Sequence, residues 1–302
     1  MRVEGSKRPA TDASVPARRG GSATRSARSC ETFRMHSTMN EASENPDIEL
    51  SIVIPAYNEA GRIEPTLERI LAFLDTTGIA AEVLVVDDGS TDATAQVVSR
   101  FVEADRRVRL LSNDRNRGKG YTVKHGILEA AGEWILFSDA DLSTPIEDYE
   151  RLDAFRDDYD IVIGSRALPD SRVEIHQPFY REWMGKIFNR LVQTIVLSGL
   201  RDTQCGFKLF RGEIARQVAR RQRFDGFAFD VEFLYLGRLL GARIREVPVR
   251  WYNSPASRVR VLRDSWRMFW DLLRIRWTHR GGRQCVPPLA AGIPPDRAEL
   301  PS

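Results

Sequence analysis

Two aspartates follow a short apolar run in the middle of the chain. Asp139 and Asp141 stand within SDADLSTP at 138–145, directly after the run Trp134–Phe137, which is too short for a helix and predicts a buried strand. Carboxylates two residues apart at a strand end can converge on one hard divalent cation. Mg²⁺ and Mn²⁺ prefer oxygen ligands, and Mg²⁺ is usually held by one or two carboxylates together with substrate phosphates. Alone, this pattern is a weak signal, because aspartate is also a common turn former.

Further polar residues follow other predicted strands. The stretch LSIVIPAYNE at 50–59 is a first strand that ends in polar residues, and AEVLVVDDGSTDAT at 81–94 is a second strand that ends in two acids. NRGKG at 116–120 is a glycine-rich loop in which backbone N–H groups can approach phosphates closely. DIVIGSR at 160–166 is a further strand. The residues at these ends are Tyr57, Asn58, Glu59, Asp87, Asp88, Lys119, Ser165 and Arg166.

The elements that must position these residues alternate along the chain. An amphipathic helix is predicted over 63–75, a strand over 108–111 and a helix after 120. Strands and helices at this spacing predict an α/β fold with a mostly parallel sheet and helices on both faces. In such sheets ligands bind beyond the carboxyl ends of the strands. We therefore expect the polar residues to share one crevice.

Composition excludes several other classes of protein. The net charge of +3 is concentrated in residues 1–40, where eight Lys/Arg and three acids leave the rest of the chain slightly acidic. A nucleic-acid-binding surface is therefore not indicated. The cysteines Cys30, Cys205 and Cys285 form no CxxC motif and suit a reducing cytoplasm. No apolar stretch approaches the ~20 residues that span a bilayer, so we expect no membrane crossing.

Both ends of the chain have a biased composition. Residues 1–46 are rich in Arg, Ser, Ala, Gly and Pro and predict a disordered basic tail. An organellar transit peptide, a tail that contacts anionic lipid, and a true start at Met35 or Met39 are alternatives. Residues 281–302 are rich in Gly and Pro and also predict disorder.

Six motifs together resemble a known family. IPAYNE, VVDDGSTD, NRGKG, DADLSTP, GSR and DTQCGFKLF, in this order, resemble family-2 nucleotide-sugar glycosyltransferases. Within that family they are most similar to the dolichyl-phosphate β-glucosyltransferase group, with dolichyl-phosphate mannose synthase as a cousin. The resemblance covers about residues 48–280 and implies the GT-A fold, an α/β fold with a mostly parallel central sheet and helices on both faces.

The resemblance also implies a donor site. Asp87 would accept a hydrogen bond from the nucleotide base, and Asp139 and Asp141 would hold Mg²⁺ or Mn²⁺ on the diphosphate. The cousin has a Gln two residues after the second aspartate, where this chain has Ser143, and the eukaryotic glucosyltransferases carry an amino-terminal membrane helix that this sequence lacks. The residues expected to contact the substrates are Pro55, Ala56, Tyr57, Glu59, Asp87, Asp88, Lys119, Asp139, Arg166 and Lys208.

The second half of the sequence supplies candidates for the acceptor. DTQCGFKLF at 202–210 contains Asp202 and Lys208, and Asp230 lies near the start of a predicted helix. We expect Asp141 to act in catalysis together with Asp202 or Asp230, and the sequence does not distinguish these two. Arg166, Arg201 or Lys208 would position an acceptor phosphate through charge-assisted hydrogen bonds.

Two predicted helices are rich in large apolar residues. In the helix over 180–197 they indicate either core packing or a wall beside a hydrophobic acceptor. In the stretch 257–280 arginines alternate with an aromatic stripe, which is typical of a helix at a membrane interface. Docking of that helix on the domain is the alternative. The stripe consists of Trp266, Phe269, Trp270, Leu273 and Trp277.

These observations predict one enzyme and several alternatives. We expect a metal-dependent, inverting glycosyltransferase that moves a hexose, with glucose from UDP-glucose favoured, to a polyprenyl phosphate of dolichyl or undecaprenyl type. It would be cytoplasmic and attached peripherally to the cytoplasmic membrane face. Alternatives are a mannose donor, a soluble acceptor, or a non-catalytic nucleotide-sugar-binding protein. The expected regions are a tail (1–46), a GT-A catalytic domain (47–253), a membrane-associating helix region (254–280) and a second tail (281–302).

Overall fold

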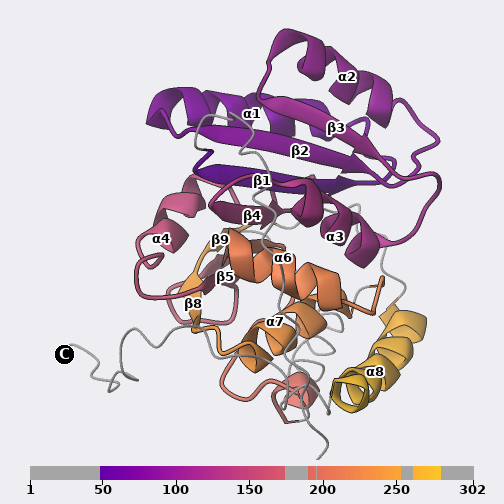
Figure 1. Cartoon of the computed structure of the whole chain (residues 1–302), viewed down its shortest axis with the longest axis vertical. Coiled ribbons are helices and arrows are strands. Elements are labelled where there is room, and N and C mark those ends of the chain that lie inside the picture. Colours follow the sequence, from indigo (N-terminus) through magenta and orange to yellow (C-terminus); the bar gives the residue numbers. More distant parts are fainter. Residues whose placement is uncertain (1–47, 174–189, 195, 227, 253–260, 280–302) are drawn as a thin grey trace, which may run out of the picture. The chain divides into compact units, whose positions relative to one another are not determined.

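The structure is a computed structural model that describes residues 48–173, 190–194, 196–226, 228–252 and 261–279, with the side chains of 172–173 and 261–269 excepted. Its centre is a seven-stranded sheet (Figure 1). In spatial order the strands are β3 (Val108–Ser112), β2 (Ala81–Asp87), β1 (Leu50–Ala56), β4 (Trp134–Ser138), β7 (Phe207–Arg211), β5 (Ile161–Ser165) and β8 (Ile244–Pro248).

Helices connect these strands as the alternating pattern predicts. The helices are α1 (Ile63–Thr77), α2 (Thr94–Ala104), α3 (Lys119–Glu129), α4 (Tyr149–Asp153), α6 (Gly212–Arg221), α7 (Phe229–Leu239) and α8 (Val261–Thr278), with a 3₁₀ turn, η1 (Ile146–Asp148). Two short strands, β6 (Arg172–Val173) and β9 (Arg250–Trp251), pair separately. The predicted α/β architecture is therefore confirmed, and α1 extends two residues beyond the expected 63–75.

Alternate residues of each strand pack into two hydrophobic cores on opposite faces of the sheet, because successive side chains of a β-strand point to opposite faces. Val53 of β1 and Val86 of β2 belong to a core that includes residues of α3, α6, α7 and α8. Ile52 and Val85 point the other way, into a core that includes residues of α1, α2 and α4. Helices thus cover both faces, which leaves the strand ends as the open edges of the sheet.

The strand β7 breaks the parallel order, and the sequence pattern did not reveal it. It lies antiparallel between β4 and β5, with Phe137 opposite Lys208 and Ile163 also opposite Lys208. The apolar and polar residues of DTQCGFKLF at 202–210 predict no strand. The insertion brings the polar start of this motif beside the carboxyl end of β4, where Asp139 follows.

The helix α8 has two different faces. Leu272 and Ile275 are fully buried and belong to the same core as α6 and α7. Trp270, Leu273 and Trp277 are 50%, 37% and 79% exposed. At about 100° per residue these two sets lie on opposite sides of the helix. Docking on the domain therefore accounts for one face only. Most of the predicted apolar helix over 180–197 lies outside the described residues, and of those described, 190–194 are helical.

Gly206 controls how closely β7 approaches the end of β4. The Asp139 N–H donates to the Gly206 carbonyl oxygen at 3.1 Å. A Cβ atom at Gly206 would lie 2.0 Å from Asp139 Oδ2. The absence of a side chain at this position therefore allows Asp139 to sit against the β7 entrance.

We predict that Gly206→Ala lowers the free energy of unfolding by about 1–3 kcal/mol, the usual cost of overpacking. Chemical denaturation at constant pH measures this change. Gly61→Ala is the matched control, because a Cβ atom at Gly61 meets no atom within 4 Å. Equal stability of the two variants would show that the Gly206 contact is not tight.

Candidate active site

The loops after β1 and β2 are joined by hydrogen bonds. Ala56 and Asp87 are paired in register at the last position of their strands. Asn58 donates its N–H to Ser90 Oγ at 2.8 Å, and its side-chain oxygen accepts from the Thr91 N–H at 2.7 Å. Asn58 has φ 54°, a left-handed conformation that asparagine tolerates well. The predicted residues brought together at this edge are Pro55, Ala56, Tyr57, Glu59 and Asp87.

Asp88 organises the glycine-rich loop from within the protein. It is 3% exposed. Its carboxylate accepts from the N–H groups of Arg117 at 2.8 Å and Gly118 at 2.9 Å, and from the Asn113 amide at 2.8 Å. These loop N–H groups are therefore engaged by the protein. The side chain of Lys119 is the group of this loop that reaches the predicted metal ligands.

Lys119 forms an ion pair with the first aspartate of the central motif. Its Nζ atom lies 2.7 Å from Asp139 Oδ1 and 5.2 Å from the centre of the Phe137 ring. Burial lowers the pKa of Lys119, but the charges of Asp139 and Asp230 outweigh burial and raise the pKa above its usual value. Lys119 is therefore a fixed positive charge. Both partners remain partly open, with side chains 28% and 33% exposed.

The second aspartate sits in a strained turn. Asp141 Oδ1 accepts from the Ser143 N–H at 3.0 Å, and Oδ2 lies 3.7 Å from Arg62 Nη1. Leu142, between Asp141 and Ser143, has φ 44°, which is unfavourable for a leucine. The turn is supported by Thr66 of α1, whose hydroxyl donates to the Ala140 carbonyl at 2.8 Å. Such strain persists only where the surroundings determine the conformation.

A second lysine–aspartate pair lies behind the first. Lys208 is 1% exposed, and its Nζ atom contacts Asp230 Oδ1 at 2.5 Å. The same Nζ atom lies 5.4 Å from the Phe137 ring centre. Burial raises the pKa of Asp230, and the charges of Lys208 and Lys119 offset this only in part. The structure thus brings the predicted residues Lys119, Asp139, Asp141, Lys208 and Asp230 into one charged cluster.

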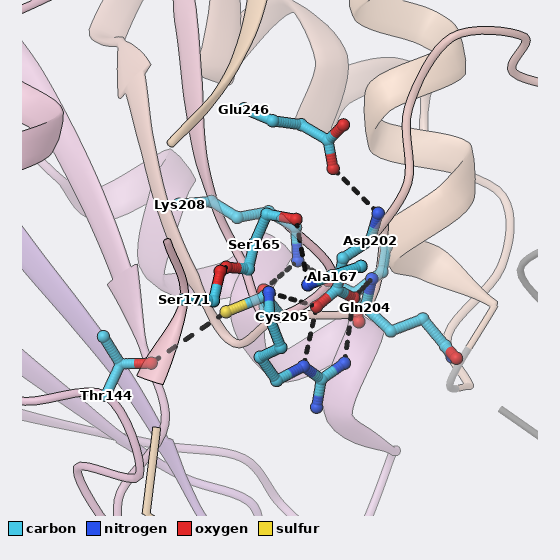
Figure 2. Close-up of polar contacts among 11 residues, drawn as sticks. Thr144, Ser165, Ala167, Ser171, Asp202, Gln204, Cys205, Lys208 and Glu246 are labelled. Atoms are coloured by element: carbon cyan, nitrogen blue, oxygen red, sulfur yellow. Dashed lines mark hydrogen bonds and ion pairs between the residues drawn. The ribbon is translucent and has the colours of Figure 1, made fainter. Parts of the chain in front are cut away.

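Asp202 is paired with an arginine, Arg166, whereas Asp230 is paired with a lysine (Figure 2). Its carboxylate accepts from Arg166 Nε at 2.7 Å and Nη2 at 2.9 Å, and its N–H donates to Glu246 at 2.7 Å. Burial raises the pKa of Asp202, but the Arg166 charge and hydrogen bonds outweigh it and hold the pKa below its usual value. A carboxylate in this bidentate pair is a poor proton acceptor. Asp202 positions Arg166, whose guanidinium lies 5.4 Å from the Trp251 ring centre.

The residues present fit a Mg²⁺ or Mn²⁺ ion bound jointly with a ligand. Asp139 and Asp141 offer partly exposed carboxylates from one turn. Among the residues that the structure describes, no three His, Cys, Asp or Glu side chains gather into a site made of protein ligands alone. Two carboxylates plus phosphate oxygens and water are the usual donors for Mg²⁺. Burial raises the pKa of Cys205 to about 11, so its thiol is no competing ligand.

Three residues that shape the site were not predicted from the sequence. Arg62 lies beside Asp141 and also pairs with Glu59, and its place six residues after the end of β1 gave no local signal. Gly206 lies within the DTQCGFKLF motif, and nothing in that motif indicates its contact with Asp139. Glu246 binds the N–H groups of Arg201 and Asp202 at 2.8 and 2.7 Å. It comes from β8, and no pattern within the motifs points to it.

Comparison with known proteins identifies the family. The model of glycosyl transferase family 2 matches residues 51–219. The chain is 37% identical over 252 residues to a dolichyl-phosphate β-glucosyltransferase of Dictyostelium discoideum, covering 78% of this chain and 77% of that protein. It is 33% identical over 259 residues to the Homo sapiens protein of the same name, covering 81% and 80%.

Solved structures confirm the fold. Mannosyl-3-phosphoglycerate synthase from Rubrobacter xylanophilus is 19% identical with a TM-score of 0.59, covering 82% of this chain and 79% of that one. Glucosyl-3-phosphoglycerate synthase from Mycobacterium tuberculosis, in complex with Mn²⁺, UDP and glucosyl-3-phosphoglycerate, is 19% identical with a TM-score of 0.57, covering 81% and 83%. The resemblance drawn from the six motifs is thus confirmed. The chain belongs to glycosyl transferase family 2: it is a glycosyltransferase of GT-A fold, homologous to dolichyl-phosphate β-glucosyltransferases.

Proposed function

We propose that this glycosyltransferase moves glucose from UDP-glucose to a polyprenyl phosphate at the cytoplasmic membrane surface. The observation that carries the proposal is the convergence of Lys119, Asp139 and Asp141 at the carboxyl ends of the strands. The names of the curated relatives support a glucosyl donor and a dolichyl-phosphate acceptor.

The donor would occupy the edge formed by β1, β2 and β4. Asp87 would accept a hydrogen bond from the base, beside Pro55, Ala56, Tyr57 and Glu59 at the end of β1. The diphosphate would face the cluster of Lys119, Asp139 and Asp141. Lys119 contributes a positive charge that remains fixed during the reaction. A Mg²⁺ or Mn²⁺ ion held by Asp139 and Asp141 would supply further neutralisation of the departing diphosphate.

The acceptor phosphate would be positioned by arginine. Arg166 directly follows β5 and donates to Asp202 through Nε and Nη2, so its Nη1 is the guanidinium nitrogen that these two bonds do not use. Arg201, which directly precedes Asp202 in the sequence, is exposed. Lys208 is buried against Asp230, so we assign it to orienting that carboxylate. Because a phosphate monoester is already ionised at neutral pH, the reaction requires no strong base.

The chemical step is a single displacement. An acceptor phosphate oxygen bonds to the anomeric carbon while the bond from that carbon to the UDP oxygen breaks, and UDP leaves. One displacement inverts the anomeric centre and gives a β-linked product from an α-linked donor. Asp230 lies among Lys119, Lys208 and Asp139, so we infer that it, rather than Asp202, faces the reacting groups.

The proposed membrane contact is the outer face of α8. Trp270, Leu273 and Trp277 are exposed on the side opposite the buried residues, and Arg274 and Arg276 flank them. Exposed tryptophans with arginines at their edges suit the interfacial region of a bilayer. None of the helices described by the structure is both long enough and apolar enough to span a membrane.

An organic-extraction assay tests the transfer. Purified protein is given polyprenyl phosphate, Mg²⁺ or Mn²⁺, and labelled UDP-glucose, with labelled GDP-mannose in parallel. We expect label from UDP-glucose in the organic phase. Asp141→Asn should reduce its rate roughly 100- to 1,000-fold, as is typical for losing one group that stabilises the transition state. Label only from GDP-mannose would overturn the donor, and donor turnover with water-soluble product would overturn the acceptor.

Vesicle sedimentation tests the membrane contact. We predict that Trp270→Ala combined with Trp277→Ala weakens binding to anionic vesicles at least ~10-fold, because both rings lose apolar burial. Val102→Ala with Leu128→Ala is the matched control, since these residues are 39% and 38% exposed on other helices. Equal sedimentation of wild type and both variants would contradict a membrane role for α8.

A further inference from the structure

A buried carboxylate outside the charged cluster holds the segment next to the Lys119 loop. Glu232 of α7 is 0% exposed. Its Oε1 atom accepts from the Arg223 N–H at 2.9 Å and Oε2 from the Phe224 N–H at 2.9 Å. His279 Nε2, just after α8, contacts Oε1 at 2.7 Å. A buried carboxylate needs such partners, because an unpaired charge in the interior is costly.

The segment that Glu232 holds is the support of the Lys119 loop. The Asp225 carbonyl accepts from the Gly120 N–H at 2.8 Å and from the Tyr121 N–H at 3.4 Å. No side chain caps the start of α3, so this carbonyl satisfies N–H groups that a helix start leaves unpaired.

The glycines on either side of Lys119 allow the two segments to touch. A Cβ atom at Gly118 would lie 2.7 Å from the Asp225 oxygen, and one at Gly120 would lie 2.8 Å from the Phe224 oxygen. Gly118 also has φ 100°, which other residues rarely adopt. The backbone at Lys119 is thus pressed against the 223–226 segment, and a shift of that segment must move the lysine.

We propose that Glu232 is a positioning residue for Lys119. His279, just after the end of α8, helps to hold the Glu232 carboxylate in place. Glu232 fixes the 223–226 segment, the segment fixes the start of α3, and Lys119 is thereby held 2.7 Å from Asp139. The inference rests on the proposed function in one respect, namely that Lys119 faces the donor diphosphate. It also ties the helix proposed to bind the membrane to the donor site.

Hydrogen exchange tests the mechanical link without any substrate. In Glu232→Gln the amide group opposes one of the N–H donors, so the amides of Gly120 and Tyr121 should exchange at least ~10-fold faster than in wild type. His279→Ala, at a side chain with 11% exposure, should give a smaller change of the same sign. It serves as the second variant should Glu232→Gln not fold.

Glu82→Gln is the matched control for a buried carboxylate. Glu82 is 5% exposed and accepts from Ser51 Oγ, the Ala131 N–H and Arg109 Nη1. The Glu82→Gln substitution should lower the free energy of unfolding without changing the hydrogen-exchange rates of the Gly120 and Tyr121 amides. Unchanged exchange at these amides in both Glu232→Gln and His279→Ala would overturn the link, as would equal acceleration in the control.

A double-mutant cycle tests whether the link acts through Lys119. Glu232→Gln should weaken UDP-glucose binding about 10-fold in the wild-type background and less than about 2-fold in the Lys119→Ala background, as expected for coupled residues. Equal losses in both backgrounds would overturn the positioning role, because a general structural defect adds independently. If wild type binds no UDP-glucose, the proposed donor is wrong, and the exchange result alone decides the link.

Discussion

The Lys119–Asp139 ion pair is the contact around which the site is built. It joins a lysine at the start of α3 to an aspartate just after β4, and both side chains remain partly open. Each partner is positioned by backbone contacts that need glycine: Gly118 and Gly120 on one side, Gly206 on the other. The strand order β2-β1-β4 brings these loops to one edge of the sheet.

The charges of the cluster account for the expected metal dependence. Three carboxylates, Asp139, Asp141 and Asp230, are each close to a cation, namely Lys119, Arg62 and Lys208. Arg62 is also shared with Glu59, so these cations do not exceed the nearby carboxylates, and a diphosphate entering the site would add negative charge that needs compensation. A divalent cation shared by Asp139, Asp141 and the diphosphate would supply it. The charges on the chain itself therefore favour a metal-dependent reaction.

Local patterns were sufficient to predict the parallel half of the fold and much of the site. The apolar runs before Tyr57, Asp87 and Asp139 became β1, β2 and β4, because a buried strand needs little more than continuous apolar side chains between turns. The residues at their ends therefore met as expected. The six motifs also indicated the family, which the family model confirms.

The contributions that the sequence did not reveal are all non-local. The strand β7 follows a glycine turn and pairs antiparallel with β4, a choice that depends on tertiary packing. The pKa is lowered at Asp202 and raised at Asp230, and the difference depends on which cation each carboxylate contacts in the folded chain. The partner is Arg166 for Asp202 and Lys208 for Asp230. For α8 the sequence predicted an aromatic stripe but not the buried pair Leu272 and Ile275, whose burial depends on the core that they share with α7.

Calorimetric titration with UDP, in the presence and absence of Mn²⁺, tests the central claim most directly. Wild type and the double variant Asp139→Asn with Asp141→Asn would be compared under identical conditions. We expect Mn²⁺ to tighten UDP binding to wild type at least ~10-fold, since the ion would be held by the carboxylates and the diphosphate together, and we expect the double variant to lose this effect. UDP affinity that is independent of Mn²⁺ in wild type, or an unchanged Mn²⁺ effect in the double variant, would contradict that claim.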